Sequence, residues 1–289
     1  MRVTEANKVR RPIFAGSWYP DQAEDCRREI NGFMEEGRRW TLPQGSFVGG
    51  IVPHAGWYFS GSLACNVIGR LREGDGVDVV AVLGMHLHTG SANVIMAEGA
   101  WETPFGDLPI ADELAGDLID QFQFEIETCT DFQPDNTIEL QLPFIKYFFP
   151  EVRILTLGLP PRNASLAIGD ALAAAAGKRN LKLRVIGSTD LTHYGRNYGM
   201  SSHGSGAEAL EWVRKSNDRR IIEAMLALDG PRVIREALLN QNACCAGAAA
   251  TAMTAATALG AKSPVALQYT TSHEKSPGDS FVGYVGILM

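Results

Sequence analysis

The chain has 289 residues, 45% of them apolar, and a formal net charge of −7, which predicts a globular protein with a large buried core. Lys and Arg are scattered along the chain, so we expect no nucleic-acid partner. No apolar stretch reaches the roughly 18 residues of a membrane span, and residues 1–20 carry charges where a signal peptide is apolar, so we expect a cytoplasmic protein that does not enter a membrane.

The expected elements alternate in type along the chain. Residues 46–52 predict a strand, 60–72 a helix and 77–84 a second strand. Residues 93–110 predict an antiparallel excursion around a Thr-Pro turn, after which 152–159, 165–177 and 181–188 repeat the strand, helix and strand pattern. Residues 205–241 are helical with a break at Gly230 and Pro231, 244–260 predict a helix of small residues, and 265–271 and 281–289 predict two final strands.

This alternation indicates βαβ units, and hence an α/β fold whose sheet is mostly parallel, with helices on both faces. The excursion and the final strands make the sheet mixed. Because no repeat, low-complexity tract or Pro/Ser-rich linker interrupts the chain, we predict a single domain over residues 1–289.

Three histidine-containing loops each follow an apolar, strand-like run. They are PHAG with His54, GMHLHTG with His86 and His88, and STDLTHYG with Asp190 and His193. Loops that leave the carboxyl ends of parallel strands open onto one edge of a sheet, where ligands bind in such folds. Although a single loop histidine is usually a surface residue, three in the same position favour a metal site or a general base.

The five cysteines do not form a disulfide framework, because Cys26, Cys65 and Cys129 are isolated and Cys244 and Cys245 are adjacent. The adjacent pair precedes the helix of small residues, and a helix N-terminus stabilises a thiolate for metal binding. From spacing alone, the simpler interpretation is preferred: both are small apolar residues in a tight helix contact.

Two further residues have alternative interpretations. Asn136 as N-cap with Glu139 three residues on forms a capping box, so Glu139 either starts a helix or places a carboxylate in the pocket. Trp18, in the loop AGSWYP, either lines the pocket mouth or packs in the core.

Seven segments of the chain resemble the Memo family and occur in the same order as in that family: AGSWYP, IVPHAGWYFSG, LGMHLHTG, WETPFGDLPI, DNTIELQLPF, STDLTHYG and CCAG. The resemblance runs from about Phe14 to the last strand. It implies a fold like the catalytic subunit of class III extradiol dioxygenases, which hold non-haem Fe(II), with a cysteine in place of the carboxylate ligand.

Carried over by position, the resemblance implies that His54, His88 and Cys244 bind one divalent metal ion, Fe(II) first, with Cu or Zn as alternatives. Order of motifs favours Cys244 over Cys245 as the ligand. His193 matches the acid/base and Asp190 is expected to orient it, while Glu139, His86 and Trp18 are expected to contact the substrate or the ligands.

The chain also departs from the family pattern. GPSHH is replaced by GMHLH, which puts Leu87 at the penultimate histidine and adds His86, and HS-x-E is replaced by Asn136 to Glu139. The family has a CG-x-x-P pattern at the cysteine, but here Cys245 follows Cys244 in place of the glycine. These changes keep the three expected ligands but alter the surroundings of the substrate.

Three functions are compatible with these residues. The first is a metal-dependent oxidoreductase acting on a small molecule, although a thiolate ligand is easily oxidised in an oxygen-activating site. The second is a binding or adaptor protein that holds a peptide or small molecule in a vestigial pocket, which the loss of a histidine at Asn136 favours. A zinc hydrolase is the third. A homo-oligomer is compatible with all three.

Overall fold

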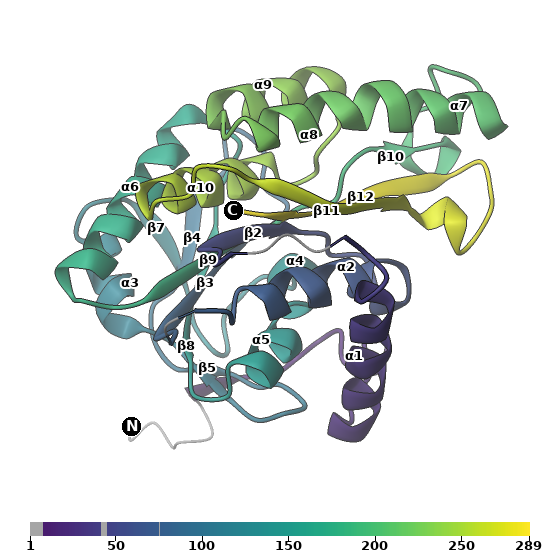
Figure 1. Ribbon diagram of the computed structural model, residues 1–289. Helices are drawn as coiled ribbons and strands as arrows, with labels where there is room; N and C mark the ends of the chain where they lie inside the picture. Colours follow the sequence, from purple (N-terminus) through teal and green to yellow (C-terminus); the bar gives the residue numbers. More distant parts are fainter. Residues whose placement is uncertain (1–7, 42–44, 75) are drawn as a thin grey trace.

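A mixed sheet forms the centre of the computed structural model, which describes residues 8–41, 45–74 and 76–289 (Figure 1). Within these ranges the sheet has nine strands in the order β10-β12-β2-β9-β3-β8-β4-β7, with β11 paired to β12. The four adjacent central strands are parallel to one another: β2 (Gly49–Val52), β9 (Leu183–Ser188), β3 (Val79–Gly84) and β8 (Arg153–Gly158).

Antiparallel pairing extends this parallel centre on both sides. On one side β12 (Phe281–Leu288) pairs with β2, and both β11 (Val265–Thr271) and β10 (His193–Tyr194) pair with β12. On the other side β4 (Asn93–Met96) runs antiparallel to β8 and parallel to β7 (Phe124–Glu127). A second, small sheet contains β1 (Val9–Arg10), β5 (Ala100–Trp101) and β6 (Leu108–Pro109).

The sequence of β3 explains why both faces of the sheet are covered. All six of its residues are buried. Alternate side chains point to opposite faces, so Val79, Ala81 and Leu83 join one apolar core while Val80 and Val82 join the other.

Helices lie on both faces (Figure 1). One face is covered by α1 (Ala23–Gly37), α2 (Trp57–Arg70), α4 (Asn136–Glu139) and α5 (Leu142–Phe148). The other is covered by α3 (Asp112–Ile119), α6 (Asn163–Lys178) and α10 (Ala246–Ala258), with α8 (Asp218–Leu226) and α9 (Gly230–Asn240) packed beyond them. α7 (Gly206–Trp212) packs near β10 and is joined to α8 by a π-helix, Val213–Asn217. Short 3-10 helices occupy Arg196–Tyr198 and Ser272–Glu274.

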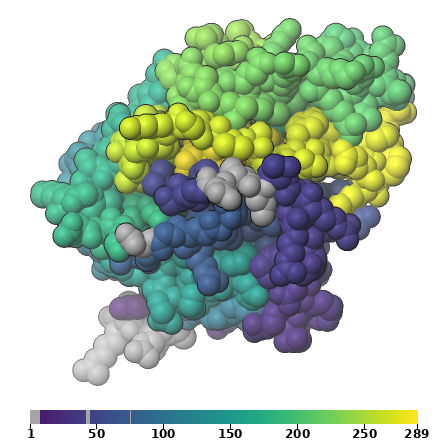
Figure 2. Space-filling model, in the orientation of Figure 1, coloured from purple at the N-terminus to yellow at the C-terminus, as the bar shows by residue number. Residues whose placement is uncertain are grey.

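The mixed α/β architecture with helices on both faces is therefore confirmed. In the space-filling view the C-terminal strands run as a yellow band between the two helical layers (Figure 2). The predicted break in residues 205–241 is also present, because α8 ends at Leu226 and α9 begins at Gly230. None of the helices in the described ranges has both the length and the apolar character needed to span a membrane.

Candidate metal centre

The parallel strands bring three of the predicted loops together. His54 follows β2, His86 follows β3, and Asp190 follows β9, and these three strands are neighbours in the sheet. α10 packs against the same strands, so its N-terminal end delivers Cys244 and Cys245 to this edge. Fold topology thus explains how residues from four distant segments meet.

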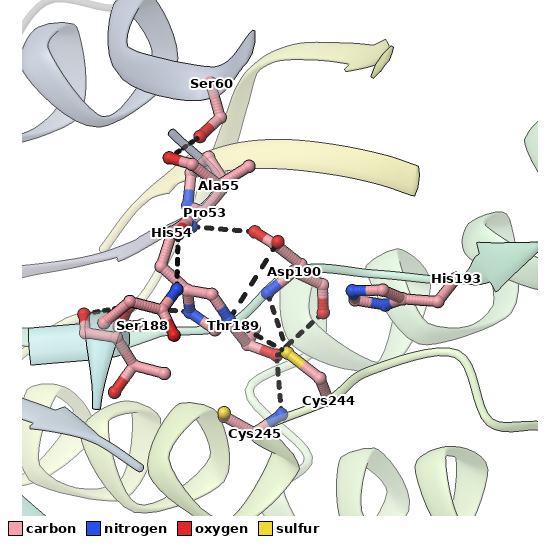
Figure 3. Close-up of polar contacts among 12 residues, drawn as sticks. Pro53, His54, Ala55, Ser60, Ser188, Thr189, Asp190, His193, Cys244 and Cys245 are labelled. Carbon is pink, nitrogen blue, oxygen red and sulfur yellow. Dashed lines mark hydrogen bonds and ion pairs between the residues drawn. The ribbon is translucent and has the colours of Figure 1, made fainter. Parts of the chain in front are cut away.

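Four potential metal ligands converge here: the imidazoles of His54 and His86 and the thiols of Cys244 and Cys245. One donor atom from each lies within 4.8 Å of all the others. The Cys244 Sγ lies 3.2 Å from His54 Nε2 (Figure 3). The imidazole rings of His54 and His86 meet edge to face with centroids 5.0 Å apart. Two imidazoles with thiolate sulfur suit Zn(II), Cu or Fe, so the residues fit a transition metal.

The tautomer of His54 is fixed by its neighbours. Its Nδ1 lies 3.0 Å from Ser188 Oγ, and the Ser188 hydroxyl donates its only proton to the Thr137 carbonyl at 2.7 Å. The Ser188 oxygen must therefore accept from His54 Nδ1–H. This leaves Nε2 of the neutral ring as the lone-pair nitrogen, facing Cys244.

His86 is oriented in the same way. Its Nδ1 lies 3.1 Å from Asp135 Oδ2, and its backbone N–H donates to the same oxygen at 3.1 Å. Burial would raise the pKa of Asp135, but hydrogen bonds from His86 and Thr137 outweigh it and lower the pKa to about 2. A carboxylate accepts only, so His86 carries its proton on Nδ1 and turns Nε2 to the cluster.

Electrostatics favour a thiolate at Cys244. Its sulfur accepts from the Asp190 backbone N–H at 3.3 Å. Burial would raise the pKa of Cys244, but the Cys245 thiol and the two imidazoles outweigh burial and hold the pKa well below its ordinary value. Without metal, the hydrogen bonds to Asp135 and Cys244 raise the pKa of His86 to about 10. A bound cation would take the place of the protons shared between these sulfur and nitrogen atoms.

Asp190 and His193 both line the pocket beside the cluster, but the structure gives them different partners from those expected. Asp190 Oδ1 accepts from the His54 backbone N–H at 2.7 Å, so this carboxylate holds the His54 loop (Figure 3). His193 Nδ1 donates to the Leu191 carbonyl at 3.1 Å, which leaves its Nε2 free to accept a proton. The Leu191 carbonyl, rather than Asp190, orients the His193 ring.

A pocket of about 540 Å³ opens over His54 and His86. Its lining includes three aromatic side chains, Trp18, Tyr58 and Tyr198, and three serines, Ser272, Ser276 and Ser280. Trp18 is 41% exposed and lines this pocket, so of its two interpretations the pocket position is the observed one.

Glu139 does not line the pocket. Its buried carboxylate accepts from the backbone N–H groups of Ile13 and Phe14 and from the Tyr19 hydroxyl. Burial raises its pKa despite these hydrogen bonds. Glu139 therefore anchors the segment that carries Trp18 and touches neither the cluster nor a substrate in the pocket.

His88 does not join the cluster. It is exposed, its backbone N–H donates to Ser91 Oγ, and its Nδ1 accepts from the Gly90 N–H at 3.1 Å. His86, two residues earlier, occupies the position expected for His88. The N-cap of α4 is also shifted by one residue, because Asp135 rather than Asn136 accepts from the Thr137 N–H.

Two residues of the site escaped the sequence analysis. Asp135 precedes the Asn136 that seemed to be the cap, and Ser188 is the last residue of a buried strand. A polar side chain that ends an apolar strand at the ligand-binding edge is a signal that points to Ser188. Asp135 had no comparable signal, because Asp and Asn cap helices equally well.

Comparison with known proteins supports the resemblance. Residues 10–288 match the family model described as Memo-like protein. The chain is 32% identical to a MEMO1 family protein of Pyrococcus furiosus, over 97% of this chain and 99% of that one. It is 33% identical to one of Methanothermobacter thermautotrophicus, over 96% and 98%.

Similarity in fold extends to a solved structure with little sequence identity. The uncharacterized protein JW3007 from Escherichia coli K12 matches with a TM-score of 0.50 and 12% identity, over 78% of this chain and 91% of that chain. The family match and the relatives span nearly the whole sequence. This chain belongs to the Memo family.

Proposed function

We propose that this protein binds one transition-metal ion through His54, His86 and Cys244 and is a metal-dependent oxidoreductase that acts on a small molecule. The observation that carries the proposal is the common orientation of the imidazoles. His54 and His86 each donate Nδ1–H to a fixed oxygen and turn Nε2 toward the Cys244 sulfur. Such pre-oriented rings are typical of metal ligands.

The metal would supply Lewis-acid or one-electron chemistry to a molecule in the adjoining pocket. Fe(II) remains the first candidate, with Cu and Zn as alternatives, since this donor set accepts all three. In this proposal His86 replaces His88, because only His86 lies with the other donors.

His193 is proposed to move a proton. Its Nδ1–H donates to the Leu191 carbonyl, so Nε2 is the basic atom available to a molecule in the pocket that His193 lines. Asp190 supports the site by fixing the His54 backbone through a 2.7 Å hydrogen bond.

A binding or adaptor protein is the second candidate, and Asn136 favours it. Where the family pattern has a histidine, the Asn136 amide donates to the His54 carbonyl at 2.8 Å. That amide positions a ligand but supplies no acid or base. The pocket would then hold a peptide or small molecule without turnover.

Elemental analysis of protein purified without oxygen tests the metal site. We expect near-stoichiometric metal in the wild type, loss in His54→Ala, His86→Ala and Cys244→Ala, and retention in the control His88→Ala. Oxygen consumption by the loaded protein with chelating aromatic compounds then tests oxidoreductase activity. Metal-free wild type, or ligand variants that keep their metal, would refute the site. A loaded protein without turnover on any chelating compound would favour the adaptor.

A further inference from the structure

Cys245 is not needed by the site proposed above, yet its sulfur lies among the ligands. The Cys245 thiol is one of the four donor groups whose atoms lie within 4.8 Å of one another. The residue is 2% exposed, so this sulfur is enclosed by protein. Because this sulfur is buried beside the proposed ligands, its position is not that of an ordinary surface cysteine.

The backbone of Cys245 is held on both sides. Its N–H donates to Thr189 Oγ1 at 3.1 Å, which ties it to the loop after β9. Its carbonyl accepts from the Ala249 N–H at 3.1 Å, the first hydrogen bond of α10. The side chain is thus delivered to the cluster from a fixed position.

Cys245 is also an unusual residue for its position. It is the N-cap of α10, where Ser, Thr, Asp or Asn normally accepts a hydrogen bond from the helix. The Cys245 side chain makes no such bond and joins the group of potential ligands instead. The 13-residue helix behind it directs the positive end of its dipole toward Cys245. Burial and the neighbouring Cys244 raise the pKa of the Cys245 thiol well above its ordinary value, so this thiol would ionise only when a cation replaces its proton.

We propose that Cys245 is a second thiolate ligand, which makes the resting centre a four-coordinate site of two imidazoles and two thiolates. This inference rests on the proposed metal site. Two thiolates and two imidazoles in tetrahedral arrangement are a donor set typical of Zn(II). They do not suit an Fe(II) centre that keeps several coordination positions open. The inference therefore predicts that the metal of the resting protein, whether Zn(II) or Fe(II), has no open coordination position.

The pocket supports a closed resting centre. His54 and His86 line it, but neither cysteine does. A small molecule in the pocket therefore meets the imidazole side of the centre, and it binds the metal only after one of the four donors leaves. Redox or hydrolytic chemistry would require such an opened state.

Spectroscopic titration of the apo protein with Co(II) tests this inference, because sulfur-to-cobalt charge-transfer absorption grows with the number of bound thiolates. The variant is Cys245→Ser, since serine is a strong N-cap and preserves the start of α10. The matched control is Cys26→Ser, a fully buried cysteine whose hydrogen bond to the Pro20 carbonyl a serine can keep. All three proteins are reduced and titrated without oxygen.

We expect wild type and Cys26→Ser to show about twice the charge-transfer absorption of Cys245→Ser, with at least tenfold weaker Zn(II) binding in Cys245→Ser. That loss corresponds to about 1.4 kcal/mol. If Cys245→Ser keeps the full absorption and affinity, Cys245 is not a ligand and the three-ligand site stands. If the wild type binds neither Co(II) nor Zn(II), the proposed function fails as well.

Discussion

Replacing Ser188 with alanine tests whether the fixed tautomer of His54 matters for metal binding. The Ser188 oxygen is the acceptor for His54 Nδ1–H, and both residues are almost completely buried. In Ser188→Ala the N–H loses its acceptor, which costs roughly 1–3 kcal/mol in a buried place. His54 can avoid this cost by moving the proton to Nε2, but that nitrogen is then unavailable to a metal.

The cost therefore falls on the metal-bound state, where Nε2 must be free. We expect metal affinity to decrease about 10- to 100-fold, the usual effect of removing a group that orients a ligand. Competition with a chromophoric chelator measures the affinity, and urea unfolding of the apo protein measures stability separately. The lost hydrogen bond to the Thr137 carbonyl affects apo and metal-bound protein alike, so it cancels in the affinity.

Ser165→Ala is the matched control. Ser165 is also buried, and its hydroxyl donates to the Pro160 carbonyl at 2.8 Å, but it contacts no histidine. This control is expected to lose stability and keep its metal affinity. Equal affinities for Ser188→Ala and Ser165→Ala would refute the argument.

Three further predictions follow from single contacts. Asp135→Asn keeps a good N-cap but turns an amide N–H₂ toward His86, so metal affinity in the same chelator competition should fall about 10-fold or more. Equal affinity would contradict the role of the carboxylate. His193→Gln should keep its metal by elemental analysis and lose about 100-fold or more in turnover if His193 moves the proton, whereas loss of metal would make it a ligand. Burial raises the pKa of Asp218 from 3.8 to about 7, so ionising this carboxyl group destabilises the folded protein. The destabilisation is absent below pH 4 and grows between pH 4 and 7. At 1.36 kcal/mol per pKa unit it reaches about 4 kcal/mol above pH 7. In urea unfolding, Asp218→Asn should therefore gain stability relative to wild type at pH 8 and not at pH 4, and a pH-independent difference would contradict the assignment.

The sheet could be predicted from sequence because its central strands carry an unambiguous signal. β3 and β9 are buried along their full lengths, and each is read as a short apolar run between polar loops. Because these strands are parallel, their carboxyl ends point to one edge of the sheet, which brings the loops after β2, β3 and β9 together. The prediction that these loops meet therefore depended on strand direction, which the alternation of strands and helices indicates.

Side-chain direction within those loops was harder to predict, as Glu139 illustrates. Glu139 is a carboxylate at the end of α4, close in sequence to pocket residues, but it points to the N-terminal segment and accepts from the N–H groups of Ile13 and Phe14. Nothing in the sequence near Glu139 indicates that partner, because Ile13 lies 126 residues away. Long-range backbone donors cannot be read from local pattern.

The exchange of His88 for His86 has a definite backbone cause. Met85 has a φ of 72°, a left-handed conformation that is rare for a residue other than glycine. Its N–H donates to Thr137 Oγ1, and a side chain on Gly158 would collide with the Met85 sulfur, so β8 leaves room for this turn. The turn directs His86 toward the cluster, packs Leu87 against the apolar core and leaves His88 in solvent. Matching the loop to a family pattern counts residues but carries no information on φ. A left-handed turn at Met85 therefore determines which histidine lies in the cluster. A variant with an extended backbone there would remove His86 from the cluster without altering either histidine.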